Sequence, residues 1–238
     1  MKKLGIIGGL GPMATAYFFY LLTSMSRADT DQEHMEVLMH SKPSIPDRTR
    51  YILDRSQPNP APEMIAVGRE LKDMGAEVLA IPCITAHYFH DELEEGIGIR
   101  VFHAVRETAL YLREAGVERV GILATDGTVQ SGLFPGILEE YGITAIHPDE
   151  ACQQTVMDLI YRQIKSGEKG NPEQLDQVGQ ALFRAGAQVN LLGCTELSLF
   201  KRNYRLPAGY LDVMEVLARR AVLDCGRFDA RYGQLVTQ

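Results

Sequence analysis

Two short apolar runs, each followed by a cysteine and then a threonine, place the strongest constraint on the fold. Residues 78–81 precede Cys83 and Thr85, and residues 189–192 precede Cys194 and Thr195. Such runs are typical of buried parallel strands, which lead into helices at their carboxyl ends. We therefore expect each thiol at a strand-to-helix corner, where the positive end of the helix dipole lowers a thiol pKa. Two such thiols suggest a cofactor-free pair of acid and base groups that face one carbon atom.

The two halves of the chain have similar patterns. Residues 119–128 resemble the opening strand and loop, and the spacing from Ile6 to Cys83 nearly equals that from Ile122 to Cys194. This predicts an α/β fold of two similar domains related by a pseudo-twofold axis, each a parallel sheet with helices on both faces, with the active site in the cleft between them. A closing helix from residue 210 to about 223 is expected to pack on the first half. The predicted domains are therefore 1–104 plus 208–238, and 105–207.

Composition excludes several classes of function. The 238 residues carry a formal net charge of −7, so a concentrated basic face for nucleic acid is not expected. No apolar run is long enough to span a membrane. The four cysteines are far apart and lack metal-ligand spacing, which indicates neither a zinc site nor a disulfide framework. These features predict a cytoplasmic protein without a bound metal.

Polar loops after the strands are candidates for binding an anion. Gly9, Leu10 and Gly11 lie in a glycine-rich turn before a helix, where backbone N–H groups suit a carboxylate, although a tight turn without a ligand fits as well. Thr125 follows the corresponding strand of the second half, where helix capping is an equally good interpretation. The G-x-G-x-x-G spacing of dinucleotide-binding loops is absent.

Four motifs together resemble the aspartate/glutamate racemase family, and within it the aspartate racemases. These are a Gly-Gly-Met-Gly-Pro-type loop, a Pro-Asp-Arg-Thr segment, a Pro-Cys-Asn-Thr-Ala-His motif and a Gly-Cys-Thr-Glu motif, which match residues 8–12, 46–49, 82–87 and 193–196. They occur in order over nearly the whole chain, to about Tyr210. One position departs from the family pattern, because Ile84 stands where the family has Asn.

The resemblance implies a pyridoxal-independent racemase that interconverts the L and D forms of aspartate or a related acidic amino acid. Cys83 and Cys194 would transfer the Cα proton. Arg48 and Lys165 fall where aspartate racemases bind the distal carboxylate, although either residue by itself also fits a solvated side chain. Tyr161 lies one helical turn before Lys165 and is expected on the same face. A homodimer is the family expectation.

The residues near the cysteines have more than one interpretation. Thr85 and Thr195 fit helix capping or hydrogen bonding to a substrate. Glu196 is a candidate to orient the substrate ammonium or to tune the neighbouring thiol. His87 fits a core position or a role in the environment of Cys83. Ile84 cannot donate a hydrogen bond to the α-carboxylate as Asn does, so activity on aspartate would be weak or the substrate less polar.

Other functions remain open on the same fold. A hydantoin racemase, a maleate isomerase or an arylmalonate decarboxylase type of enzyme would use similar carbanion chemistry, although a decarboxylase needs one cysteine only. A carboxylate-binding homologue with catalysis impaired by Ile84 is an alternative from another class. A redox dithiol is disfavoured, because a cleft wide enough for a substrate separates the sulfur atoms beyond disulfide distance.

Overall fold

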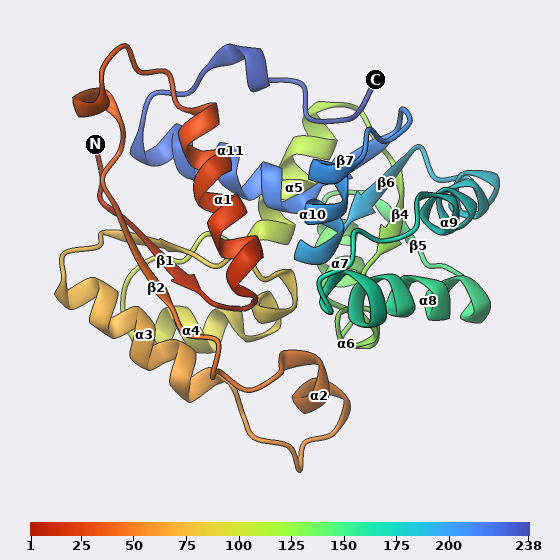
Figure 1. Cartoon of the computed structure of the whole chain (residues 1–238), viewed down its shortest axis with the longest axis horizontal. Helices are drawn as coiled ribbons and strands as arrows, with labels where there is room; N and C mark the ends of the chain where they lie inside the picture. Colours follow the sequence, from red (N-terminus) through yellow and green to blue (C-terminus); the bar gives the residue numbers. More distant parts are fainter.

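The computed structural model describes all 238 residues and contains two parallel sheets flanked by helices (Figure 1). The elements of the first half are β1 (Leu4–Gly8), α1 (Pro12–Met25), η1 (Asp31–Glu33), β2 (Val37–Ser41), α2 (Arg48–Leu53), α3 (Ala61–Asp73), β3 (Val78–Ala80), η2 (Ile84–Phe89), α4 (His90–Ile97) and α5 (Ala104–Glu114).

The second half repeats this alternation of strands and helices. Its elements are β4 (Arg119–Leu123), α6 (Asp126–Gln130), α7 (Leu133–Glu140), β5 (Thr144–Ile146), α8 (Glu150–Met157), the π-helix η3 (Asp158–Ile164), α9 (Pro172–Arg184), β6 (Val189–Leu192), α10 (Thr195–Asn203), β7 (Tyr210–Asp212), α11 (Val213–Cys225) and η4 (Ala230–Tyr232).

The two sheets share one strand order. The first is β2-β1-β3 and the second is β5-β4-β6-β7, and every pairing is parallel. In the first sheet an isolated parallel bridge between Leu79 and Val101 stands where the second sheet has β7. This edge of the first sheet has no longer strand, because Ala104 already begins α5. The prediction of two similar parallel-sheet α/β domains is confirmed.

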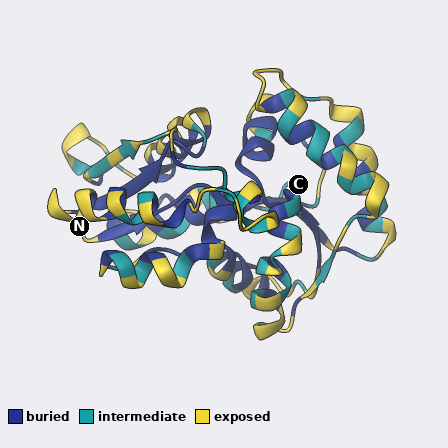
Figure 2. Cartoon of the chain, turned by 90° about the horizontal axis from the view of Figure 1, so that it is seen from below, coloured by how far each residue is buried: buried dark blue, intermediate teal, exposed yellow.

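The central strands are buried on both faces, because helices cover both sides of each sheet. All five residues of β1 and all four of β6 are buried. Figure 2 shows the buried strands inside the two lobes and the exposed outer surfaces of the helices. One continuous cluster of buried apolar side chains runs through both halves and includes Phe18 of α1, Leu191 of β6 and Leu217 of α11. Shared packing therefore holds the halves together.

The end of the chain differs in part from expectation. A helix was expected from residue 210, but Tyr210–Asp212 forms β7, which pairs with β6 of the second sheet. The helix begins only at Val213, where the side chain of Asp212 accepts a hydrogen bond from the N–H of Met214. Helix α11 then packs against α1 and α5. The domain boundaries at 104 and 207 stay a prediction.

None of the helices combines the length and the apolar character that crossing a membrane requires.

Candidate active site

Both predicted cysteines lie at strand-to-helix corners and line one cavity. Cys83 follows β3 and immediately precedes η2, and Cys194 follows β6 and immediately precedes α10. The two residues are 7% and 6% exposed. The cavity that they share has a volume of about 20 Å³ and draws its walls from both halves of the chain. The structure therefore brings the two predicted thiols together at one cavity.

The cavity brings together most of the residues that the sequence singled out. The predicted residues that line it are Leu10, Arg48, Cys83, Ile84, Thr85, Thr125, Tyr161, Lys165, Cys194, Thr195 and Glu196. Asp47 and Thr49 also line it and were not among the predicted site residues. Both belong to the Pro-Asp-Arg-Thr motif at residues 46–49. That motif could have identified them as site residues, but only its arginine was predicted to bind the substrate.

Arg48 enters the cavity from the first residue of α2. Its Nη1 donates hydrogen bonds to the carbonyl oxygens of Pro46 (2.9 Å) and Ile45 (3.3 Å), and its Nε is buried without a hydrogen-bond partner. Burial lowers the pKa of this guanidinium, but negative charge on Cys83 and Asp47 raises it, and the net pKa shift is upward. Arg48 is therefore a positively charged side chain that hydrogen bonds hold in place beside Cys83. Its Nε–H group remains available to donate a hydrogen bond.

Lys165 is the second cation of the cavity. Its Nζ lies 3.9 Å from the centre of the Tyr161 ring and 3.9 Å from Oε1 of Glu196. The expected shared face of Tyr161 and Lys165 is thus confirmed. Burial lowers the pKa of Lys165, but the charges of Glu196 and Cys194 raise it, with a net upward shift.

The second thiol is hydrogen-bonded to a carboxylate. Cys194 Sγ donates to Oε2 of Glu196 at 2.8 Å, and Thr195 Oγ1 donates to the same oxygen at 3.0 Å. Burial raises the pKa of Cys194 well above its usual value, and the charge of Glu196 raises it further, while Lys165 lowers it. The expectation that the helix dipole lowers this thiol pKa is therefore wrong, because burial and the adjacent carboxylate outweigh it.

Four threonine hydroxyls join the walls of the cavity. Thr49 Oγ1 donates to Thr125 Oγ1 at 3.2 Å, and Thr85 Oγ1 lies 2.9 Å from Thr128 Oγ1. All four side chains are buried, and they come from α2, η2 and the start of α6. The side chain of Thr125 also caps α6 by accepting a hydrogen bond from the N–H of Thr128. This network joins α2 to the second half through Thr49 and Thr125, and joins η2 to the second half through Thr85 and Thr128.

Ile84 lies directly beside Cys83 and is 1% exposed. It lines the cavity and also belongs to the apolar cluster shared by the two halves. The wall therefore has an apolar side chain at this position, without a donor or an acceptor.

Three predicted site residues do not line the cavity. Gly9 adopts a positive φ of 88°, where its N–H donates to Thr15 Oγ1 and a Cβ would collide with the backbone of Lys42. Gly11 directly precedes α1. His87 points elsewhere, because its Nε2 bonds to the carbonyl oxygen of Ile81 at 3.0 Å. The glycines therefore shape the turn, and only Leu10 of that loop reaches the cavity.

Nowhere in the structure are three or more His, Cys, Asp or Glu residues arranged to hold a metal ion.

Comparisons with known proteins agree with this geometry. A family model described as Asp/Glu/Hydantoin racemase matches residues 7–221. An aspartate racemase from Picrophilus torridus has a similar structure, with a TM-score of 0.85, 30% sequence identity and 98% of each chain covered. The broad specificity amino-acid racemase RacX of Bacillus subtilis is 25% identical over 225 residues, which cover 92% of this chain and 96% of that protein.

A more distant structure shows the same fold. Glutamate racemase from Francisella tularensis, in complex with D-glutamate, has a TM-score of 0.66 and 16% identity, with 94% of this chain and 81% of that chain covered. The family model spans nearly all of the present chain, including both cysteines. The protein is therefore an isomerase that belongs to the Asp/Glu/Hydantoin racemase family.

Proposed function

We propose that this racemase interconverts the L and D forms of aspartate, or of a closely related acidic amino acid, by moving the Cα proton between Cys83 and Cys194. The observation that carries the proposal is that these two thiols, delivered by the two halves of the chain, line one cavity together with two cations. The Picrophilus torridus aspartate racemase, similar over nearly the whole chain, supports this choice of substrate.

The chemistry requires one base and one acid on opposite faces of Cα. In one direction, a thiolate at Cys83 removes the proton, the C–H electron pair stays on Cα, and the thiol of Cys194 protonates the other face. The reverse direction exchanges the two roles. The hydrogen bond from Cys194 Sγ to Glu196 supports its assignment as the proton donor, since the carboxylate holds that proton on sulfur.

The charges that line the cavity complement an acidic amino acid. Arg48 and Lys165 supply two positive charges for its two carboxylates, and Asp47 and Glu196 supply carboxylates for its ammonium group. The free Nε of Arg48 supports a role in carboxylate binding, because a guanidinium grips a carboxylate through two parallel hydrogen bonds. Cations near the reacting carbon also stabilise the charge that develops when the proton leaves.

A cavity of about 20 Å³ has room for about one water molecule, so the substrate requires a more open arrangement. The segment at 41–62 is the natural moving part, because it brings α2 and Arg48 to the cavity. We propose that this segment acts as a lid, and that the hydroxyl contact of Thr49 to Thr125 of the second half forms when it closes.

A racemase of broader specificity is the second candidate. The observation that favours it is Ile84, an apolar side chain beside the reacting thiol where the family pattern has a hydrogen-bonding Asn. Bacillus subtilis RacX, which is described as a broad specificity racemase, supports this alternative. A homodimer remains part of the proposal on family grounds.

Chiral chromatography distinguishes these candidates. The purified protein is incubated separately with the L forms of aspartate, glutamate and a set of uncharged amino acids, and the D product is measured over time. Conversion of aspartate in preference to the others supports the first candidate, and comparable conversion of uncharged amino acids supports the second. Binding of aspartate without conversion of any amino acid would instead favour the carboxylate-binding alternative.

A further inference from the structure

Each of the two active-site cysteines is followed four residues later by a polar residue that lies beside the cap of another helix. After the first cysteine this residue is His87, and its ring centre is 5.2 Å from that of His103, which caps α5. After the second cysteine it is Ser198, whose Oγ donates a hydrogen bond of 2.7 Å to Oδ1 of Asp212, which caps α11. The two halves of the chain therefore place a polar pair at equivalent positions.

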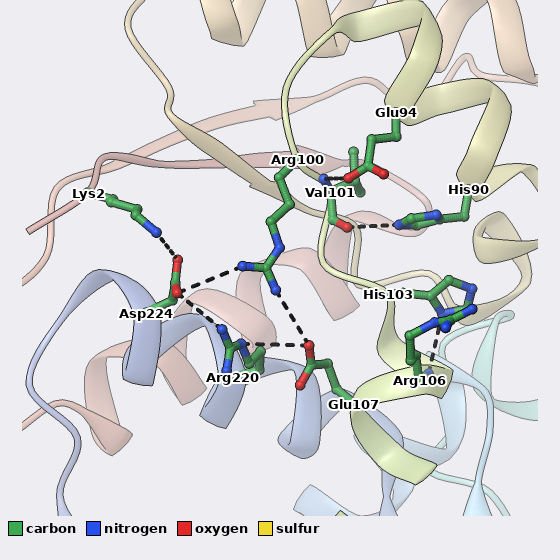
Figure 3. Close-up of polar contacts among 10 residues, drawn as sticks. All are labelled: Lys2, His90, Glu94, Arg100, Val101, His103, Arg106, Glu107, Arg220 and Asp224. Carbon is green, nitrogen blue, oxygen red and sulfur yellow. Dashed lines mark hydrogen bonds and ion pairs between the residues drawn. The ribbon is translucent and has the colours of Figure 1, made fainter. Parts of the chain in front are cut away.

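The two pairs differ in how their members are bonded. His103 Nδ1 accepts a hydrogen bond from the N–H of Arg106 in α5 (Figure 3), and His87 Nε2 bonds to the carbonyl oxygen of Ile81. These imidazoles are therefore engaged by backbone groups. In the second half, by contrast, the two side chains bond to each other. We call the hydrogen bond from Ser198 to Asp212 the serine clamp.

Asp212 joins the clamp to the frame of the second sheet. It is 0% exposed and ends β7, where it pairs with Leu192, two residues before Cys194. Its Oδ1 also accepts a hydrogen bond of 2.9 Å from the N–H of Met214 in α11, and its Oδ2 is buried without a partner. Burying a carboxyl group is costly, and the two contacts of Oδ1 offset part of that cost. Oδ1 therefore connects α10 with both β7 and α11.

Ser198 lies in the turn of α10 that holds the second thiol. It is 1% exposed, and its N–H donates to the carbonyl oxygen of Cys194 at 3.3 Å. Cys194 immediately precedes α10, and Glu196 is the second residue of the helix. The clamp therefore fixes the turn that carries both the thiol and the carboxylate bonded to it.

A second tie between α10 and α11 lies farther from the thiol. Lys201 Nζ forms an ion pair of 2.7 Å with Oε2 of Glu215, and both side chains are mostly buried. Lys201 is seven residues beyond Cys194, whereas Ser198 is four residues beyond it. The ion pair thus holds the middle of α10, and the clamp holds its first turn.

We propose that Ser198 and Asp212 are positioning residues, which hold Cys194 and Glu196 in the arrangement needed for proton transfer at Cα. This inference rests on the proposed racemase function, in which Cys194 serves one face of the substrate. Neither Ser198 nor Asp212 lines the active-site cavity, so both act through α10. A proton-transfer group must lie within reach of the reacting carbon, so a displaced first turn slows the chemical step more than it weakens substrate binding.

Alkylation of the cysteines by iodoacetamide measures the clamp without relying on racemase activity. A buried thiol reacts through local opening of its surroundings, so the rate at Cys194 at fixed pH reports how firmly α10 is held. Ser198→Ala should raise that rate about fivefold, which is the ratio expected for one lost hydrogen bond. Cys83 and Cys225, followed by mass spectrometry in the same sample, should react at their wild-type rates.

Two further variants separate the clamp from general destabilisation. Asp212→Asn keeps an oxygen acceptor for Ser198 and should leave the alkylation rate of Cys194 near that of the wild type, whereas Asp212→Ala should raise it as Ser198→Ala does. Ser26→Ala removes a hydroxyl hydrogen bond of the same length, 2.7 Å, to the carbonyl oxygen of Leu22 in α1. This matched control should leave Cys194 unaffected.

Initial rates with aspartate connect the clamp to catalysis. In Ser198→Ala, kcat should fall about tenfold with KM unchanged, because a misplaced proton donor slows the chemical step and leaves binding intact. Asp212→Asn should retain the wild-type kcat.

Three results would overturn the proposal. They are an unchanged alkylation rate at Cys194 in Ser198→Ala, equally faster alkylation of Cys83, Cys194 and Cys225 in that variant, and a wild-type kcat in that variant. The first two count whether or not the protein racemises aspartate. Faster alkylation of Cys194 alone, in a protein that racemises no amino acid, would support the clamp and exclude the proposed function instead.

Discussion

The thiol of Cys194 donates a hydrogen bond of 2.8 Å to Oε2 of Glu196, two residues along the chain at the start of α10. The carboxylate accepts a second hydrogen bond from Thr195 and lies 3.9 Å from the ammonium of Lys165. A buried thiol in this setting keeps its proton, because both burial and the adjacent negative charge oppose its ionisation. The sequence motif Cys-Thr-Glu therefore places a thiol beside the carboxylate that keeps it protonated.

Replacing Glu196 by Gln should lower the pKa of Cys194, because the variant removes the negative charge beside the thiol. The pH at which iodoacetamide begins to alkylate Cys194 should fall, as measured on the Cys194 peptide by mass spectrometry. Thr195→Val is the matched control, since it removes a hydrogen bond to Glu196 and leaves the charge. Identical alkylation profiles for wild type and Glu196→Gln would show that the carboxylate does not hold the proton.

Replacing Ile84 by Asn should raise kcat/KM for aspartate by about tenfold, because a hydrogen bond to the α-carboxylate contributes about 1–3 kcal/mol. Initial rates with aspartate and with an uncharged amino acid measure the change in preference. Ile84→Val keeps the apolar wall and should leave the preference as it is. Unchanged rates on aspartate and glutamate in the Asn variant, with the fold verified by circular dichroism, would exclude Ile84 as the discriminating residue.

Replacing Gly127 by Ala should impair closure of the proposed lid. A Cβ at Gly127 would lie 2.8 Å from Thr49 Cα, so the backbone of α2 must move away. We expect a higher KM and a loss of about 1–3 kcal/mol in the free energy of unfolding, which is typical of overpacking. Gly136→Ala in α7 meets nothing within 4 Å and should be neutral or slightly stabilising. A wild-type KM in Gly127→Ala would contradict the role of this contact.

Glu215 should make folding stability depend on pH. Burial, aided by the charge of Asp212, raises its pKa to about 7. The folded protein therefore holds a proton that the unfolded chain releases near pH 4.5, so this group's stabilisation is present at low pH and is lost as the pH rises through 7.

A glutamine at position 215 cannot titrate, so it should remove this pH dependence. Between pH 5 and pH 8, the stability of wild type relative to Glu215→Gln should fall by about 2 kcal/mol, measured by urea unfolding. Glu139→Gln changes an exposed glutamate and should leave the pH profile unchanged. Parallel profiles for wild type and Glu215→Gln would contradict the assigned pKa.

Much of the fold could be predicted because its central strands carry continuous apolar runs. The strand before Cys194 is buried along its whole length, and such runs are the clearest strand signal in a sequence. The strand Tyr210–Asp212 could not be recognised in this way, because it has three residues and passes directly into the apolar pattern of α11. Only its pairing with β6 defines it.

Site residues could be predicted from the sequence where a motif fixes the local geometry. They could not be predicted where contacts between distant segments determine which side chains reach the cavity. The positions of Cys83 and Cys194 could be predicted, because each residue follows an apolar run and lies at a strand-to-helix corner. Thr49 reaches the cavity because α2 packs tightly against Gly127, a contact between distant segments. His87 lies in the motif at residues 82–87, but the short helix η2 turns its ring toward Ile81 and away from the active-site cavity.

Exchange of the α-proton for deuterium tests the two-thiol mechanism most directly. Proton NMR in deuterated water follows the α-proton signals of L- and D-aspartate with the wild type, Cys83→Ser and Cys194→Ser. The account predicts exchange of both enantiomers by the wild type, and loss of exchange, or exchange of one enantiomer only, in each serine variant. Wild-type exchange of both enantiomers by either serine variant would contradict the assignment of Cys83 and Cys194 as the proton-transfer pair.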